Sequence, residues 1–210
     1  MARKKMKRKS NYYIEIRYFG KAKYQFKSLI NEIDNKFRLK KGHKVPHITL
    51  IQPFTTKNQK LLISDFKKLC SKYEVMKFTV DGIGLFPFFV VFAKVKPDGE
   101  LIEFRNQLIN TIKSYCQIKN INRTYKPHTT IALRMGMIKC FRIWFYLKQK
   151  KMIFTNHIIR ITLLKGKKIL YEYDFTNGRL LNRRKAKNKK ELSKTFEWLK
   201  LPHPKKAKNY

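Results

Sequence analysis

Two copies of the tetrapeptide Pro-His-x-Thr constrain this chain more than any other feature of its sequence. They are Pro46-His47-Ile48-Thr49 and Pro127-His128-Thr129-Thr130. Because successive side chains of a β-strand point to opposite faces, each His shares a face with the Thr that follows two residues later. Proline directly before each His suits the first residue of a strand, where a missing backbone donor costs least. Each tetrad therefore predicts a strand that presents an imidazole beside a hydroxyl.

The two tetrads lie in a longer repeat. Leu29-Ile30-Asn31 begins 18 residues before His47, and Leu108-Ile109-Asn110 begins 20 residues before His128. A fixed order of motifs at similar spacing is typical of two copies of one structural unit. We therefore expect an α+β fold with two pseudo-symmetric lobes, each an antiparallel sheet with flanking helices, around a central groove.

Hydrophobic periodicity predicts the remaining elements. Apolar residues at helical spacing indicate helices within 26–37, 62–70, 101–116 and 137–147. Other apolar patterns indicate strands at 12–19, 77–83 and 88–95, one strand from each His, and a hairpin of 158–164 and 169–175 that turns at 165–167. These elements place one bilobal domain over residues 11–178. It lies between a basic N-terminal tail, 1–10, and a basic C-terminal tail, 179–210, which is either disordered or a helix over 190–200.

The charge of the chain indicates its class of partner. The formal net charge is +37, and without the net +6 of residues 1–9 and the net +10 of residues 179–210 it is still +21 on residues 10–178. A folded body this basic attracts polyanions, so RNA or DNA is the expected partner. A general drift of composition toward Lys, Ile and Asn is the competing explanation.

Cysteine usage and hydropathy indicate the compartment. Cys70, Cys116 and Cys140 have no CxxC spacing and cannot all pair within one chain, so we expect a reducing, cytoplasmic setting. The longest apolar run, 85–93, is interrupted by Pro87 and is too short to span a bilayer. We therefore expect no membrane association.

A strand face with His and Thr two residues apart can bind and cleave a phosphate ester. The hydroxyl donates to a non-bridging oxygen while the imidazole transfers a proton beside it. One match is weak, but two matches inside a duplicated unit indicate a single site. The spacing of His43 and His47 suits zinc only on a helix, which Gly42 and Pro46 disfavour, so we expect no metal and no cofactor.

On these motifs the chain resembles the two-histidine (2H) phosphoesterase superfamily, and within it the 2'-5' RNA ligase and RNA cyclic phosphodiesterase branch. The resemblance covers roughly residues 12–175. It implies two lobes that each contribute one His-x-Thr element to a central groove. Leu50 and Ile131, which follow the two Thr residues, also fit the family pattern. The catalytic set implied by the resemblance is His47, Thr49, His128 and Thr130.

The resemblance also implies an activity. One imidazole takes a proton from water that attacks a 2',3'-cyclic phosphate at an RNA end, and the other protonates the departing ribose oxygen. The two Thr hydroxyls stabilise charge on the phosphoryl oxygens. The product is a 2'-phosphate, and the reverse reaction is 2'-5' ligation. RNA with a cyclic phosphate end, tRNA fragments included, is then the partner of a chain expected to be a monomer. The sequence leaves open which His is the base.

Weaker candidates surround the tetrads. Tyr125 and Phe54 are candidates for stacking on a base, although aromatic side chains more often fill a core. Lys44 and Lys126 flank the tetrads and are candidates for contacts with the RNA backbone. Relatives often carry an Arg after the second motif, where this chain has Leu133 and then Arg134; Arg134 reaches phosphate only if a bulge turns it to the other face.

Two alternatives remain open from the sequence. The first is a non-catalytic basic module that holds RNA in the same groove or on its tails. The second is a phosphodiesterase that trims RNA ends in the 3'-to-5' direction. Product formation separates the enzyme from the binding module, and the chain length of the product separates the two enzymes.

Overall fold

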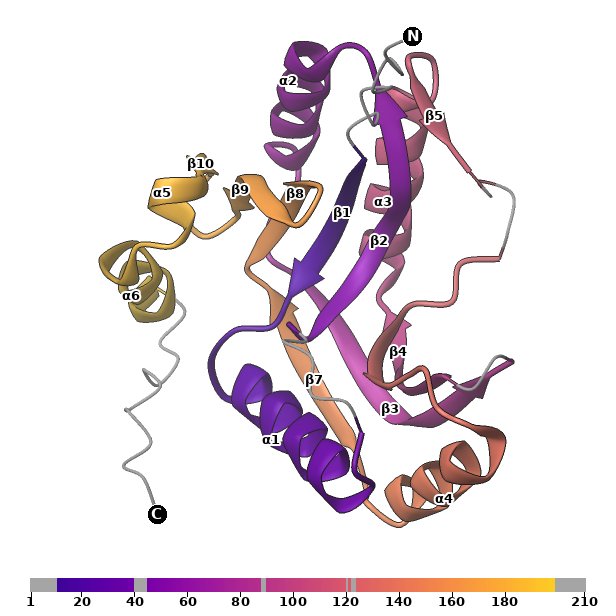
Figure 1. Cartoon of the computed structure of the whole chain (residues 1–210). Coiled ribbons are helices and arrows are strands. Elements are labelled where there is room, and N and C mark those ends of the chain that lie inside the picture. The colour runs from indigo at the N-terminus through magenta and orange to yellow at the C-terminus, as the bar shows by residue number, and fades with distance from the viewer. Residues whose placement is uncertain (1–10, 40–44, 88–89, 120, 122–123, 199–210) are drawn as a thin grey trace, which may run out of the picture.

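The chain forms two antiparallel β-sheets with helices packed on them (Figure 1), in a computed structural model that describes residues 11–39, 45–87, 90–119, 121 and 124–198. Sheet A has the strand order β10-β9-β8-β1-β2-β5 and sheet B the order β6-β4-β3-β7. The predicted α+β class is confirmed. The strands of sheet A are β1 (Tyr12–Arg17), β2 (His47–Thr56), β5 (Cys116–Ile118), β8 (Arg160–Lys165), β9 (Lys168–Asp174) and β10 (Arg179–Asn182). Those of sheet B are β3 (Met76–Phe86), β4 (Val90–Pro97), β6 (His128–Ala132) and β7 (Ile153–Ile158).

The order of elements shows the duplication. The series β1-α1-β2-α2 is repeated as β4-α3-β6-α4, with β5 inserted before β6. In each copy the two strands pair antiparallel, β1 with β2 and β4 with β6. Helix α1 lies against β6 of the other sheet, so the two lobes interlock. The helices are α1 (Gly20–Lys36), α2 (Gln59–Cys70), α3 (Gly99–Ile112), α4 (Met137–Lys148), α5 (Arg183–Ala186) and α6 (Lys189–Trp198).

Helix starts and buried faces follow the sequence pattern. The Asn58 side chain accepts a hydrogen bond from the backbone N–H of Leu61 and caps α2, and Asp98 caps α3. The buried apolar residues of each of the helices α1 to α4 lie on one side, as Phe26 and Ile33 do on α1, where both are fully buried. Their removal from water is the main stabilisation of these helices. The three cysteines are free and buried within the same core.

Two elements differ from the sequence prediction, and part of a third lies outside the described residues. Helix α3 ends at Ile112, and Cys116 is buried as part of β5, where it pairs with Thr56. The spacing of Cys116 matched the helix only by coincidence. The predicted strand 158–164 is β8, and the separate strand β7 precedes it, because the chain crosses from sheet B to sheet A at Ile159. The part of the predicted strand 88–95 at residues 88–89 lies outside the described residues.

Residues 179–198, which were expected to belong to a basic tail, form β10, α5 and α6. Strand β10 pairs with β9, and Phe196 of α6 is buried. The fully buried guanidinium of Arg160 donates to Glu172 and Asp174 at 3.1 Å and to Thr195 Oγ1 at 2.8 Å. This network fixes α6 to sheet A, which the periodicity of a Lys-rich segment did not reveal. Residues 199–210 and 1–10 of the two predicted tails lie outside the described part of the chain.

Candidate active site

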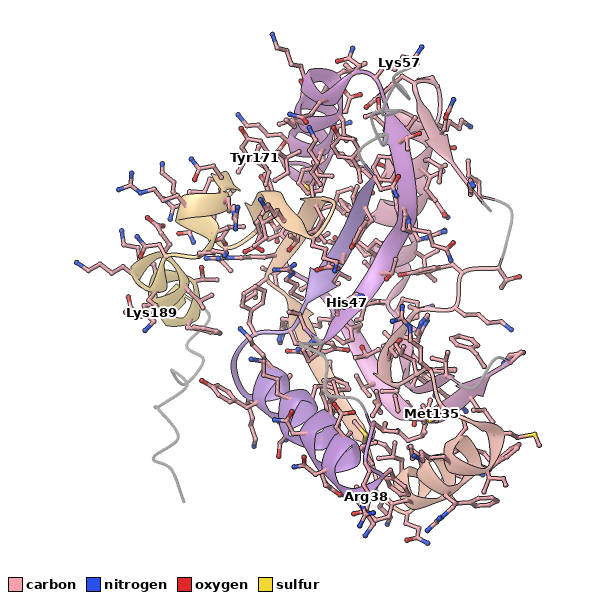
Figure 2. All side chains as sticks on the ribbon, viewed as in Figure 1. Arg38, His47, Lys57, Met135, Tyr171 and Lys189 are labelled. Atoms are coloured by element: carbon pink, nitrogen blue, oxygen red, sulfur yellow. The ribbon has the colours of Figure 1, made fainter. Side chains whose placement is uncertain are left out.

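The strands that carry the two histidines face each other between the sheets. Strand β2 of sheet A and β6 of sheet B are in contact. The hydroxyl of Tyr125, three residues before His128, donates to the carbonyl oxygen of Thr49 at 3.1 Å. Figure 2 shows His47 near the centre of the molecule, at the start of β2. The sequence prediction that both tetrads open a strand is therefore confirmed, and the fold brings the two strands together.

The two imidazoles are held in the same way. Nδ1 of His47 lies 2.7 Å from the carbonyl oxygen of Val45, and Nδ1 of His128 lies 2.9 Å from that of Lys126. A carbonyl oxygen only accepts, so Nδ1 carries the hydrogen in both rings. The neutral form of each ring then has its lone pair on Nε2. Each histidine thus offers Nε2 for proton transfer, with its ring fixed by its own strand.

Thr129 and Thr130, the two Thr residues of the second tetrad, point to different faces of β6 and make different contacts. Thr130, like Thr49, is half-buried and shares the face of its histidine. Thr129 is fully buried, and its hydroxyl lies 2.6 Å from that of Tyr18, which joins β1 to α1. Burial raises the pKa of Tyr18, so the contact is a bond between two neutral hydroxyls. Thr129 therefore anchors β6 to the other lobe, and Thr130 remains available to a ligand.

His47 lies beside a buried carboxylate. In the antiparallel pair of β1 and β2, Glu15 lies opposite Thr49 and Arg17 opposite His47. The Glu15 side chain is only 4% exposed. Its Oε1 accepts from Nε of Arg17 at 2.6 Å, and its Oε2 lies 3.9 Å from Nε2 of His47. The reactive nitrogen of His47 therefore faces an anionic oxygen when the ring is protonated.

His128 lies beside aromatic rings. The ring centroids of Phe86 and Phe92 lie 4.8 Å and 5.2 Å from that of His128, with the rings tilted toward an edge-on contact. Burial lowers the pKa of His128, and the positive charge of His47 lowers it further, against an opposing effect of the hydrogen bond to Lys126. A Cβ on Gly84 would lie 2.4 Å from the Phe92 ring, so only glycine leaves room for this wall.

A groove of about 470 Å³ opens beside His128 and Thr49, on the side of α3. Arg105 of α3 crosses it: its Nε donates to the carbonyl oxygen of Leu50 at 3.0 Å, and its guanidinium lies 4.1 Å from the Tyr125 ring centroid. The groove is mixed in character, with cationic, aromatic and aliphatic walls. It is lined by Thr49, Leu50, Ile51, Gln52, Phe86, Arg105, Ile109, Ile118, Lys119, Ile121, Thr124, Tyr125, Lys126 and His128.

The weaker sequence candidates have different outcomes. Tyr125 and Lys126 line the groove. Phe54 does not: it is 1% exposed and packs on Tyr12 in the core, so its interpretation as a base-stacking residue is wrong. Lys44 lies outside the described residues.

Arg134 is not brought into the groove. The pairing of β4 with β6 shifts between Thr130 and Ala132, so a bulge is present as the phosphate role required. Arg134 nevertheless lies two residues beyond the end of β6, exposed and with a positive φ of 60°. It is absent from the residues that line the groove, and so are His47 and Thr130.

Glu15, Arg105, Phe86 and Phe92 were not identified from the sequence. Arg105 is one basic residue among many, and nothing in the spacing of α3 marks it. Glu15 is conspicuous only in retrospect, as an acidic residue flanked by apolar ones in a strand. The available sequence signal is an acidic residue at a position expected to be buried. The role of Glu15 beside His47 depends on the pairing of β1 with β2.

Within the described residues, no group of three or more His, Cys, Asp and Glu side chains is placed to share a metal ion. No helix of the described chain is long and apolar enough to cross a membrane.

Comparisons with known proteins concern the family and the fold. The family model of the 2'-5' RNA ligase superfamily matches residues 23–165. The crystal structure of TT0787 from Thermus thermophilus is similar in fold, with a TM-score of 0.55 at 15% identity, over 79% of this chain and 97% of that one. No curated protein matches the sequence.

Two further solved structures are more distant. Escherichia coli LigT complexed with 3'-AMP has a TM-score of 0.48 at 17% identity, over 82% of this chain and 92% of that one. Usb1 of Kluyveromyces marxianus has a TM-score of 0.44 at 10% identity, over 83% of this chain and 98% of that one.

Proposed function

Because the chain belongs to the 2'-5' RNA ligase superfamily, we propose that it hydrolyses a 2',3'-cyclic phosphate at an RNA end to a 2'-phosphate, without a metal. The observation that carries the proposal is the matched pair of histidines. Both rings have Nδ1 bound to a backbone carbonyl and Nε2 available, on strands from opposite lobes. Two positioned proton carriers are what in-line displacement at phosphorus requires.

The surroundings assign a different role to each histidine. His128 is the general base, because its lowered pKa keeps Nε2 unprotonated at neutral pH. His47 is the general acid, because its Nε2 lies 3.9 Å from the Glu15 carboxylate, which pairs with the protonated ring. The positive charge on His47 and the neutral state of His128 support each other, since two adjacent imidazolium rings repel.

In the proposed step, His128 Nε2 takes a proton from water as the water oxygen bonds to phosphorus. The bond between phosphorus and the 3'-oxygen breaks, and His47 Nε2 gives its proton to that oxygen. Thr49 and Thr130 donate hydrogen bonds to the non-bridging oxygens, where charge accumulates. After one turnover His128 is protonated and His47 is neutral, and exchange with solvent restores both. In ligation the 5'-hydroxyl of a second RNA end takes the place of water: its oxygen bonds to phosphorus, the bond to the 3'-oxygen breaks, and the product is a 2'-5' linkage.

RNA is supported as the substrate class by the charge of the chain and of the groove. Arg105, Lys119 and Lys126 line the groove, and the whole chain carries a formal charge of +37. The aromatic and aliphatic walls provide surfaces for bases, and the cations provide partners for phosphates. Binding is therefore expected to weaken steeply as salt concentration rises.

An end-group assay tests the proposal. The chain is incubated, with a chelator present, with a labelled RNA oligonucleotide that ends in a 2',3'-cyclic phosphate. A new 2'-phosphate without chain shortening is expected, and it resists a 3'-specific phosphatase. His47→Ala and His128→Ala are each expected to lose activity by about 10²–10⁴-fold while still binding RNA. His157→Ala is the matched control, since His157 lies on β7, at the opposite edge of sheet B from β6.

Each other outcome favours a different function. A shortened chain indicates 3'-to-5' trimming. RNA binding without any product, equal in the wild type and both variants, indicates a binding module and contradicts the proposed hydrolysis.

A further inference from the structure

Helix α4 exposes apolar side chains on the side that faces away from the protein. Cys140, Ile143 and Leu147 form its buried stripe against sheet B. An ordinary surface helix is polar opposite such a stripe. Here the opposite side carries the apolar residues Met137, Ile138, Phe141 and Phe145, which are 56%, 75%, 41% and 60% exposed.

The four side chains form one continuous surface, which we call the α4 ridge. At 100° per residue, Ile138 and Phe145 lie within about 20° of each other and almost opposite the buried stripe. Phe141 and Met137 continue the same side one turn at a time. Figure 1 shows α4 at the lower right edge of the molecule, with one side toward sheet B and the other outward. Contiguous exposed apolar surface of this kind marks an interaction site.

Basic residues flank the ridge. Lys139, Arg142 and Lys148 are exposed, and the helix contains no Asp or Glu. Lys148 Nζ lies 4.3 Å from the Trp144 ring centroid, and Trp144 packs against Phe145 with centroids 4.9 Å apart. A helix with Phe, Ile and Trp on one side and Lys and Arg beside them has the composition of a helix that lies in a lipid interface.

We propose that the α4 ridge docks on an anionic lipid bilayer, with Ile138 and Phe145 inserted and the flanking cations against the headgroups. A second copy of the chain is a poor occupant, because two bodies of charge +37 repel each other. RNA matches the cations but leaves the aliphatic residues Met137 and Ile138 in water. An anionic bilayer is the partner that satisfies both.

Docking through the ridge leaves the groove open. None of the residues that line the groove comes from α4. The ridge also revises the expectation of no membrane association, which rested on the lack of a spanning segment, because an interfacial helix needs no span. The sequence did not show it, since the apolar pattern of α4 fits a buried helix equally well.

Co-sedimentation of the full chain with lipid vesicles tests the proposal. Two vesicle types are compared, phosphatidylcholine alone and phosphatidylcholine with phosphatidylserine. A chain this basic binds any anionic vesicle at low salt, so the decisive measurement is made at a salt concentration that screens this general attraction. At that salt concentration the wild type is expected to remain bound to the anionic vesicles. The double variant Ile138→Ser/Phe145→Ser is expected to bind them at least about tenfold more weakly.

Ile102→Ser is the matched control, because Ile102 is 43% exposed on α3 and lies outside the ridge. It should bind vesicles as the wild type does. Equal thermal melting and equal cyclic-phosphate cleavage in all variants show that the fold and the groove are intact. The proposal is overturned if the wild type and the double variant bind alike at every salt concentration. It is also overturned if the double variant changes only self-association or only RNA binding.

Discussion

The two halves of the site have the same backbone arrangement around the histidine. They differ in the side chains that surround the imidazole ring. Both rings donate Nδ1–H to a carbonyl two residues earlier, and both are followed by a Thr on the same face. His47, however, faces the Glu15 carboxylate, whereas His128 contacts the rings of Phe86 and Phe92. Duplication of a unit supplies matched geometry, and the neighbouring strands supply different surroundings, a carboxylate beside one ring and aromatic rings beside the other.

The difference can be located at one equivalent position. Strand β1 lies beside β2 as β4 lies beside β6. Opposite the Thr of the motif stands Glu15 in the first lobe and Phe92 in the second. Opposite the His stands a basic residue in both lobes, Arg17 and Lys94. An anion at one position and an aromatic ring at its counterpart therefore account for much of the asymmetry between the histidines.

The largest expected effect is a difference between the two His→Ala variants that depends on the leaving group. With the RNA cyclic phosphate, His47→Ala and His128→Ala should each lose about 10²–10⁴-fold in kcat/KM. With bis(p-nitrophenyl) phosphate, whose phenolate departs without a proton, His47→Ala should recover most of the wild-type rate and His128→Ala should not. The release of p-nitrophenolate is followed by absorbance. Recovery in His128→Ala alone would reverse the assignment of acid and base.

A smaller effect is expected from Glu15→Gln. The amide keeps the shape of the side chain but removes the anion that pairs with protonated His47. The protonated ring then lacks its anionic partner beside Nε2, so transfer of its proton is less well positioned. The rate should fall about fivefold, as expected for loss of about 1 kcal/mol of ion pairing.

Glu32→Gln is the control for this carboxylate. Glu32 also pairs with a basic side chain, that of Lys150, but lies on α1 outside the groove. Its variant should leave the rate of cyclic-phosphate cleavage unchanged. If Glu15→Gln also leaves that rate unchanged, the contact with His47 is structural only.

Gly84→Ala tests the aromatic half with a single methyl group. The added Cβ would lie 2.4 Å from the Phe92 ring, so the ring must move away from its place beside His128. Overpacking of this kind costs about 1–3 kcal/mol of unfolding free energy. Cleavage of the cyclic phosphate is expected to fall several-fold. The acidic limb of the kcat/KM profile against pH should move, and the alkaline limb should stay in place. Gly99→Ala, where an added Cβ meets nothing within 4 Å, is the control for both melting and turnover.

The sequence predicted the local part of this site and missed the part that depends on neighbouring strands. His47 and His128 were found because alternation and the preceding proline act within a few residues. Glu15 and Phe92 were not found, because their roles follow from pairing across sheets that the sequence does not specify. The same limit explains β10, which is placed by its pairing with β9, and α6, whose place depends on the buried guanidinium of Arg160. Phe54 belongs to the same case, because the alternation of buried and exposed residues along β2 is interrupted at Ile51 and Gln52.

The smallest expected effect comes from Phe86→Ser, which exposes His128 to water while leaving every hydrogen bond of the site in place. Burial is the largest cause of the lowered pKa of His128, so exposure should raise that pKa toward its ordinary value. The base must be unprotonated to act, and the acidic limb of the kcat/KM profile should therefore move to higher pH. Activity should fall a few-fold below about pH 6.5, the ordinary pKa of histidine, and stay unchanged on the plateau. A shift of the alkaline limb instead would show that the aromatic wall acts on His47, and the two halves would not be electrostatically distinct.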